Sequence, residues 1–195
     1  KAVKGVDDFV DRQLKQDRFD VKVTPSTEAT ASSDVGDYTV GGSIDASGYA
    51  GQRYQASVKE GTLHVTPAEL TVTANDKQKV YGDADPALDY SVSGAKLGQT
   101  GEQLLNGGAL VRQPGENVGN YGIEQGELAL NNGLGGNYTL TFVDGQLQIT
   151  QATLDVTAQD KSKVYGEIDP ALTYVVSGLK NGDTREQVLS DGTVK

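Results

Sequence analysis

The sequence predicts a mostly β protein of tandem, elongated β-rich modules, each carrying one short helix. The first observation is a near-copy: KVYGDADPALDYSVSG begins at Lys79, and KVYGEIDPALTYVVSG begins at Lys163. The second is composition, because 25 glycines and 36% hydrophobic residues, with no Trp or Met, suit turn-rich strands around a thin core. The third is a series of short alternating apolar runs between turn residues. A sandwich-like module fits this pattern, and a β-grasp module, with the helix across a sheet, is the alternative.

The copy extends well beyond the quoted stretch. Residues 70–111 and 154–195 share 25 identities in 42 positions without a gap. YQASVKEGTLHVTPAEL from Tyr54 also aligns with YTLTFVDGQLQITQATL from Tyr138. We therefore expect the back part of a divergent repeat over 1–66, a complete repeat over 67–150, and the front part of a further repeat over 151–195. Permuted units, from about residue 5 to 94 and from 98 to 178, are the alternative frame.

The expected strands follow in order along the complete repeat. LTVTA from Leu70 alternates apolar and polar residues, and LDYSVSG places Leu88, Tyr90 and Val92 on one face. GALVRQP and NYGIEQGELAL supply further strands. YTLTF-VDG-QLQIT predicts a hairpin around Asp144-Gly145, in which the glycine takes the positive φ of a tight turn.

One segment of each repeat has helical character. In TGEQLLNGG, Thr100 is the candidate N-cap, Leu104 and Leu105 are the candidate buried residues, and Gly107 is the candidate terminator. DTREQVLSDG from Asp183 and DDFVDRQLKQD from residue 7 are the counterparts. We expect one or two helical turns per repeat.

The joins between repeats are short. In HVT-PA-ELTVTA and QIT-QA-TLDVTA, about two residues separate the last strand of one repeat from the first strand of the next. Such a linker restrains neighbouring modules far more than a Gly/Ser tether does, and Pro67 stiffens the first join. We expect a semi-rigid string.

The YGDADPAL stretch predicts a shaped connection between two strands. Gly82 permits a left-handed backbone, and Asp85 with Pro86 favours a turn, while Tyr81 and Leu88 pack inward. The copy predicts the same arrangement, with Tyr165 and Leu172 packing inward. A second interpretation takes the carboxylates of this motif as Ca²⁺ ligands, although the longer acidic series of a typical calcium loop is missing. The candidate ligands are Asp83, Asp85, Glu167 and Asp169.

Charge and residue content argue against several functions. The net charge of −10 disfavours nucleic acid and anionic membranes as partners, and no apolar run reaches the length of a membrane span. The absence of cysteine excludes disulfides and thiolate chemistry. His64, the only histidine, alternates with apolar residues, so we expect it to point outward. No nucleophile elbow or phosphate loop accompanies it. We predict no enzyme activity and name no catalytic, cofactor or metal residue; Ca²⁺ is the one ion left open.

The tyrosines recur at equivalent places, which favours packing over a carbohydrate-stacking platform. The equivalent pairs are Tyr38 and Tyr121, Tyr54 and Tyr138, Tyr81 and Tyr165, and Tyr90 and Tyr174.

Residues 67–195 resemble a known family. YGDADPAL, GENVGNY and NYTLTF-VDG-QLQIT, in this order, are similar to the MBG domain (mostly β, glycine-rich) of the YGX type. Residues 1–66 fit less well, because TPSTEATASSDVGDY stands where the complete repeat has a PGENVGNY-like run. The resemblance implies tandem modules of very large secreted or surface-bound bacterial proteins, including filamentous-haemagglutinin-like adhesins, and it implies no catalytic residues.

The function expected from these observations is mechanical. The chain is interpreted as a stalk segment of an extracellular or surface-bound bacterial adhesin that projects a distal binding region in adhesion or biofilm formation. The partners expected are neighbouring repeats, with host or biofilm ligands bound through other regions, and head-to-tail self-association through half-repeats is a further hypothesis. The alternative function is a ligand-binding module for glycan, matrix or another adhesin copy, located around GGSIDASGYAGQRY, with Tyr49 and Arg53 as its candidate residues.

Overall fold

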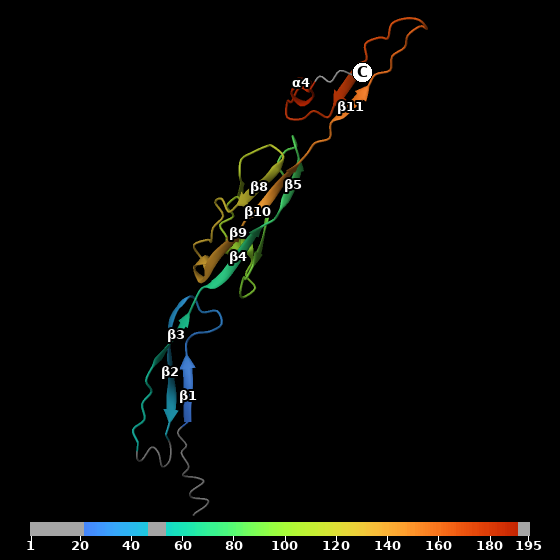
Figure 1. Ribbon diagram of the computed structural model, residues 1–195. Helices are drawn as coiled ribbons and strands as arrows, with labels where there is room; N and C mark the ends of the chain where they lie inside the picture. The colour runs from blue at the N-terminus through green and yellow to red at the C-terminus, as the bar shows by residue number, and fades with distance from the viewer. Residues whose placement is uncertain (1–21, 47–53, 191–195) are drawn as a thin grey trace, which may run out of the picture. The chain divides into compact units, whose positions relative to one another are not determined.

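A computed structural model describes residues 22–46 and 54–190. The chain divides into two compact units, residues 1–67 and 68–195, and each is described by itself (Figure 1). Among the described residues, no helix has the length and apolar character needed to cross a membrane. The predicted helix from residue 7 and the candidate binding residues Tyr49 and Arg53 lie outside the described residues.

The first unit is a three-stranded antiparallel sheet. Its strands are β1 (Lys22–Thr27), β2 (Gly36–Asp45) and β3 (Gly61–Val65), in the order β1-β2-β3. Within the described residues of this unit, no hydrophobic side chain is fully buried. The sheet therefore presents its apolar side chains, such as Leu63, to solvent.

The complete repeat is built around two parallel strand pairs that follow one another. β4 (Ala68–Ala74) pairs in parallel with β9 (Tyr138–Val143), and β5 (Lys77–Val80) pairs in parallel with β10 (Gly145–Thr150). Each parallel pair is extended by antiparallel strands. β6 (Tyr90–Ser93) pairs with β4, β8 (Gly119–Glu124) pairs with β10, and β7 (Val111–Arg112) pairs with β8. The strand orders are thus β6-β4-β9 and β5-β10-β8-β7.

The predicted hairpin of β9 and β10 is wrong. The two strands are consecutive along the chain but lie in different sheets. Gly145 does not have a positive φ; a Cβ atom there would lie 2.7 Å from the Ala74 carbonyl oxygen, so the glycine permits close approach to β4. The carboxylate of Asp76 accepts a hydrogen bond from the N–H of Gln146 at 2.8 Å. This bond joins the start of β10 to the residue that precedes β5.

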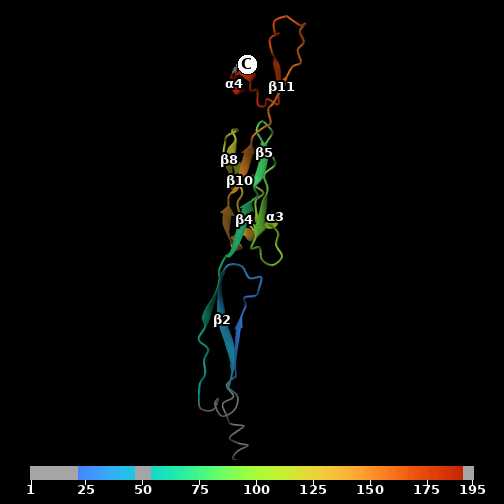
Figure 2. The ribbon, with the colours of Figure 1, turned by 45° about the vertical axis from the view of Figure 1, so that its right-hand side comes forward.

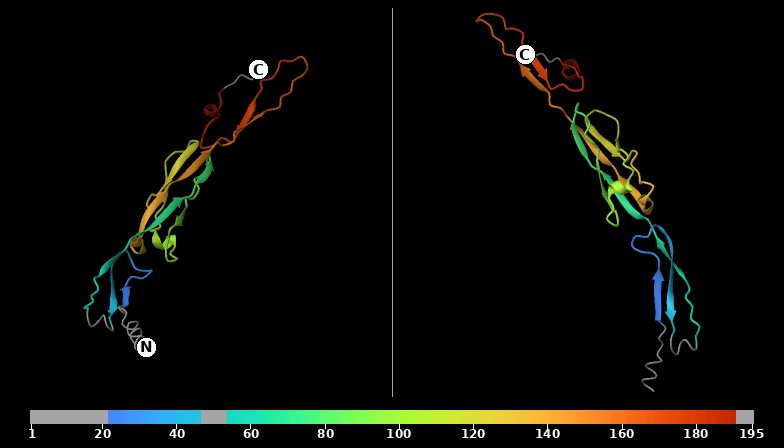
Figure 3. Two further views of the ribbon diagram at one scale, coloured as in Figure 1. Left: turned by 60° about the horizontal axis from the view of Figure 1, so that its bottom comes forward. Right: turned by 180° about the vertical axis from the view of Figure 1, so that it is seen from behind.

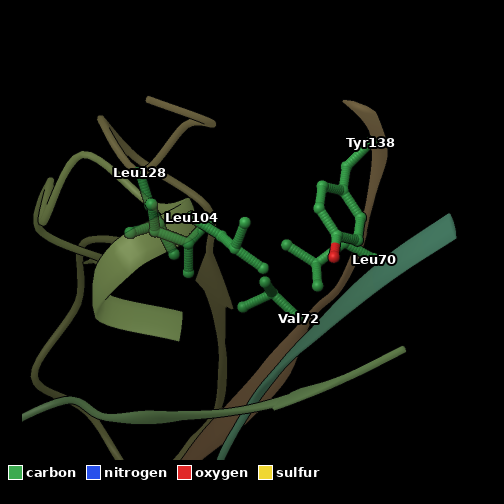
Figure 4. Packing of buried hydrophobic residues seen from close by; sticks show 6 residues of the cluster. Leu70, Val72, Leu104, Leu128 and Tyr138 are labelled. Atoms are coloured by element: carbon green, nitrogen blue, oxygen red, sulfur yellow. The ribbon is translucent and has the colours of Figure 1, made fainter. Parts of the chain in front are cut away.

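The alternation within β4 buries its apolar residues, as predicted, and the buried side chains of the repeat form two neighbouring cores. Leu70, Val72 and Ala74 are buried along β4. Figure 4 shows side chains of the first core, in which Leu70 and Val72 of β4 and Tyr138 of the neighbouring β9 lie opposite Leu104 and Leu128. Ala74, Ile123, Leu147 and Ile149 form the second core, against which Tyr81 and Leu88 pack.

A single helical turn, α3 (Gly101–Leu104), covers the first core (Figure 2). A capping box starts it: the Thr100 N–H donates to the Gln103 side chain at 2.8 Å. Leu104 and Leu105 are buried, as expected. The helix ends before Gly107, because Leu105 already has an extended backbone. A short 3₁₀ turn, η1 (Leu134–Asn137), precedes β9.

Residues 151–190 repeat the front part of this plan (Figure 3). β11 (Asp155–Ala158) pairs with β12 (Tyr174–Ser177) as β4 pairs with β6, and α4 (Arg185–Val188) has the same capping box as α3. The expected inward packing of Tyr165 and Leu172 is wrong, since the two side chains are 101% and 62% exposed. Their counterparts Tyr81 and Leu88 pack on β8 and β10, and no strand equivalent to these lies beside β11 and β12 among the described residues. For the same reason residues 161–164, the counterpart of β5, form no strand.

Candidate functional site

Four charged side chains join the YGDADPAL turn to the GENVGNY segment. We call this set, Lys79, Asp85, Arg112 and Glu116, the charge quartet. Lys79 donates to Asp85 at 2.7 Å and to Glu116 at 2.6 Å, and Arg112 donates from Nε to Asp85 at 2.6 Å and from Nη2 to Glu116. Lys79 is buried, with only 7% of its surface exposed. Each cation thus meets both acids, which is the arrangement that a buried ammonium group requires.

The quartet shifts the protonation equilibria of its members. Hydrogen bonds from Arg112 and then Lys79 hold the pKa of the Asp85 carboxyl below its ordinary value. Lys79 and then Arg112 likewise lower the pKa of Glu116, and the two carboxylates raise the pKa of Lys79. All four groups therefore stay charged at neutral pH, and the quartet acts as a cross-link rather than as an acid or base.

The turn after β5 also contacts the next repeat. The Tyr81 hydroxyl donates to the Asp183 carboxylate at 3.0 Å, and the Lys180 ammonium donates to Asp83 at 3.1 Å. Gly82 has a φ of 81°, and a Cβ atom there would lie 2.4 Å from the Lys180 Cβ. A side chain at this position would therefore disturb both the turn and the contact. The YGD stretch of one repeat and the KNGD stretch of the next form the junction.

A shallow groove of about 380 Å³ lies along this junction. Its apolar wall comes from both repeats and from the four residues between β10 and β11. The apolar lining residues are Tyr81, Val118, Ala152, Leu154, Leu179 and Val188.

The four candidate calcium ligands form ion pairs or hydrogen bonds with other protein groups. Asp85 belongs to the charge quartet, and Asp83 is paired with Lys180. Asp169 is paired with Lys163, and the side chain of Glu167 accepts the backbone N–H of Val164. Over the described ranges, no group of three or more acidic or histidine side chains is arranged to hold a metal ion.

Of the other residues singled out from the sequence, some have the expected positions and others do not. His64 points outward, as expected, and its Nδ1 lies 2.6 Å from the Asp37 carboxylate on the neighbouring strand. Several tyrosines have the expected structural roles: Tyr138 is buried, and Tyr121 donates its hydroxyl to the carbonyl of Asn117. Tyr54 and Tyr165, in contrast, are exposed.

Sequence reasoning missed the charge quartet and the junction contacts. A signal was present, because the pattern KxxxxxD at Lys79 and Asp85 recurs at Lys163 and Asp169. The partners Arg112 and Glu116 lie far along the chain and carry no comparable pattern.

These features define a tandem β-repeat protein. Residues of its YGDADPAL turn stabilise one repeat and contact the next. The family model for the MBG domain (YGX type) matches residues 70–148 and again residues 154–195, and the chain belongs to this family. No curated protein and no solved structure matches the chain.

Proposed function

We propose that this chain is a stalk segment of a large bacterial surface-bound or secreted adhesin. In this role each repeat adds length, and the junction restrains the repeat that follows. The observation that carries the proposal is the junction itself. The signature turn of one repeat contacts the next repeat through Tyr81 and Asp183 and through Asp83 and Lys180.

Several other features support a mechanical role. Both cores and the charge quartet consolidate the complete repeat internally. The groove at the junction is open, and Tyr81, Lys180 and Asp183 in its lining already serve the contact between repeats. The net charge of −10 opposes clumping of neighbouring chains.

The restraint is tested by distances across the junction. The chain has no cysteine, so Thr139→Cys and Lys161→Cys, both at exposed positions, introduce two spin labels without background. Pulsed electron paramagnetic resonance should give a narrow distance distribution. Asp83→Ala should broaden it, because the ion pair with Lys180 is lost, whereas Glu167→Ala, at the equivalent position of the next repeat, should not.

A broad distribution in the parent protein would contradict a stiff stalk. The ligand-binding alternative has a separate test, since a glycan array with the labelled parent chain should show no specific binding. A specific signal lost on substitution of Tyr49 or Arg53 would favour the binding module instead.

A further inference from the structure

Three asparagines of the chain are followed directly by glycine: Asn106, Asn132 and Asn181. In such a pair no side chain shields the glycine nitrogen, so this nitrogen is able to attack the amide carbon of the asparagine side chain. The attack takes place within the chain and needs no enzyme. Because the three pairs lie in different surroundings, the structure determines which of them reacts first.

The side chain of Asn106 is fixed by three hydrogen bonds. Its Oδ1 accepts the N–H groups of Gly108 and Ala129, each at 2.9 Å, and its Nδ2 donates to the Glu127 carbonyl at 3.0 Å. These bonds oppose any rotation that would bring the amide carbon to the Gly107 nitrogen. The Asn106 pair is therefore protected through its side chain.

The pair at Asn132 is protected at the attacking group instead. The Gly133 N–H donates to the Oδ1 of Asn131 at 3.0 Å, and the Nδ2 of Asn131 donates to the Gln103 carbonyl. Asn131 is thus held at both ends of its amide and keeps the Gly133 N–H engaged. Since the nitrogen must lose this proton in order to attack, the hydrogen bond slows the reaction.

Asn181 and Gly182 are the central residues of a tight turn. The Asp183 N–H donates to the Lys180 carbonyl at 2.9 Å, and the two central residues have positive φ, 55° and 78°. This backbone is that of a type I′ turn, which favours asparagine followed by glycine. Both residues are exposed, and within the described residues neither the Asn181 side chain nor the Gly182 N–H makes a hydrogen bond.

The complete repeat shows that this exposure belongs to the turn itself. Residues 96–99 form the equivalent turn, in which the Gln99 N–H donates to the Lys96 carbonyl at 3.0 Å. Leu97 and Gly98 have φ of 54° and 72°, and Leu97 is 63% exposed. The position of Asn181 is therefore open to solvent in the complete repeat as well, where leucine has no amide to react.

We propose that Asn181 is a site of spontaneous deamidation and the most reactive of the three pairs. The Gly182 N–H loses its proton to water, and the nitrogen attacks Cγ of Asn181. The Cγ–Nδ2 bond breaks, ammonia leaves with a proton from water, and a succinimide ring forms. Water then opens the ring at either carbonyl, which gives aspartate or isoaspartate at position 181. One amide and one water thus become one carboxylic acid and one ammonia, without any oxidant or reductant.

The product changes the junction, because Asn181 lies between two of the contact residues. Lys180 pairs with Asp83, and Asp183 accepts the Tyr81 hydroxyl. Deamidation adds a negative charge beside Asp183, and isoaspartate lengthens the main chain of the turn by one carbon atom. Ageing should therefore loosen the contact between repeats. This consequence rests on the proposed stalk function, whereas the reaction itself does not.

Peptide mapping by mass spectrometry tests the order of reactivity in the intact chain. The folded protein is aged for weeks at neutral pH in water enriched in heavy oxygen and is then digested in ordinary water, so that only deamidation during ageing carries the label. Label at position 181 should accumulate roughly tenfold faster than at Asn106 or Asn132, because each protecting hydrogen bond must be lost before those pairs react. In guanidinium chloride the three rates should converge, because the protection is lost on unfolding.

Two substitutions exchange the residues of the equivalent turns. Leu97→Asn creates an Asn-Gly pair in the exposed turn of the complete repeat, so position 97 should become labelled faster than Asn106 and Asn132. Asn181→Leu places the residue of the complete repeat at the junction. In the spin-labelled chain, ageing should broaden the distance distribution across the junction, and Asn181→Leu should prevent this broadening.

Three results would overturn the proposal. These are equal labelling of the three pairs in the folded chain, a preference for Asn181 that is just as large in guanidinium chloride, or a Leu97→Asn chain that stays unlabelled at position 97. Failure of the stalk proposal would look different: the distance distribution would be broad before ageing, while the order of labelling would remain as expected.

Discussion

Equivalent valines in the two β4-type strands provide a matched test of where the stability of this protein resides. Val72 is fully buried in the first core, while Val156, one repeat later, is 52% exposed. Val72→Ala and Val156→Ala are the same chemical change at the same repeat position. Any difference between them therefore reports the surroundings of the two valines.

The structure determines the expected size of the difference. Val72→Ala removes two buried methyl groups, worth about 0.8 kcal/mol each, or about 1.6 kcal/mol together. The cavity that remains beside Leu104 and Tyr138 adds about 1 kcal/mol. The free energy of unfolding should fall by about 2–3 kcal/mol, which lowers Tm by roughly 10–20 °C for a module of this size. Val156→Ala should cost less than about 0.8 kcal/mol, because half of its surface is already in water.

Scanning calorimetry and urea denaturation followed by far-UV circular dichroism measure both variants. Equal shifts for the two variants, or a loss below about 1 kcal/mol for Val72→Ala, would refute the assignment of the core to the complete repeat.

Three further outcomes are expected. The lowered pKa of Asp85 means that this carboxylate stabilises the folded state above its unfolded pKa, near about 4, and that the stabilisation is lost as pH falls through the folded pKa. The raised pKa of Lys79 means that the stabilisation from its ammonium group is lost only as pH rises past about 10.5. The free energy of unfolding, measured by urea titration at a series of pH values, should therefore be constant between these limits, and Lys79→Met should remove its fall at alkaline pH. Tyr81→Phe keeps the ring but deletes the hydroxyl that reaches the next repeat, so spin-label distances across the junction should broaden while the Tm of the complete repeat stays nearly constant. Gly94→Ala should be markedly more destabilising in urea titrations than Gly98→Ala, because both have positive φ but only at Gly94 would the new methyl group lie 2.3 Å from a backbone oxygen.

Local patterns in the sequence were sufficient to predict several elements of the fold. The alternation of Leu70, Val72 and Ala74 identified a strand and its buried face, and Thr100 with Gln103 marked the start of the short helix. These features depend on residues close together in the chain, which is why the sequence revealed them.

Features that depend on distant partners were not predictable in the same way. The alternating runs before and after Asp144 suit a hairpin and a crossing between two sheets equally well, and only the position of β4 decides between them. Tyr165 is exposed because none of the described residues forms a strand that covers it, although its sequence context copies that of Tyr81. Arg112 and Glu116 reach Asp85 and Lys79 only through tertiary structure.

The parallel pairing of β4 with β9 has a consequence for the kinetics of folding. Ala68 meets Tyr138 only after the intervening chain has been looped back, so the central pair of each repeat forms late and over a long sequence separation. During synthesis, the first strands of a repeat therefore remain unpaired until the last strands have been made. In an array of near-identical repeats, an unpaired strand is able to pair with the equivalent strand of another repeat. Sequence divergence, as between residues 1–66 and the later repeats, reduces such mispairing.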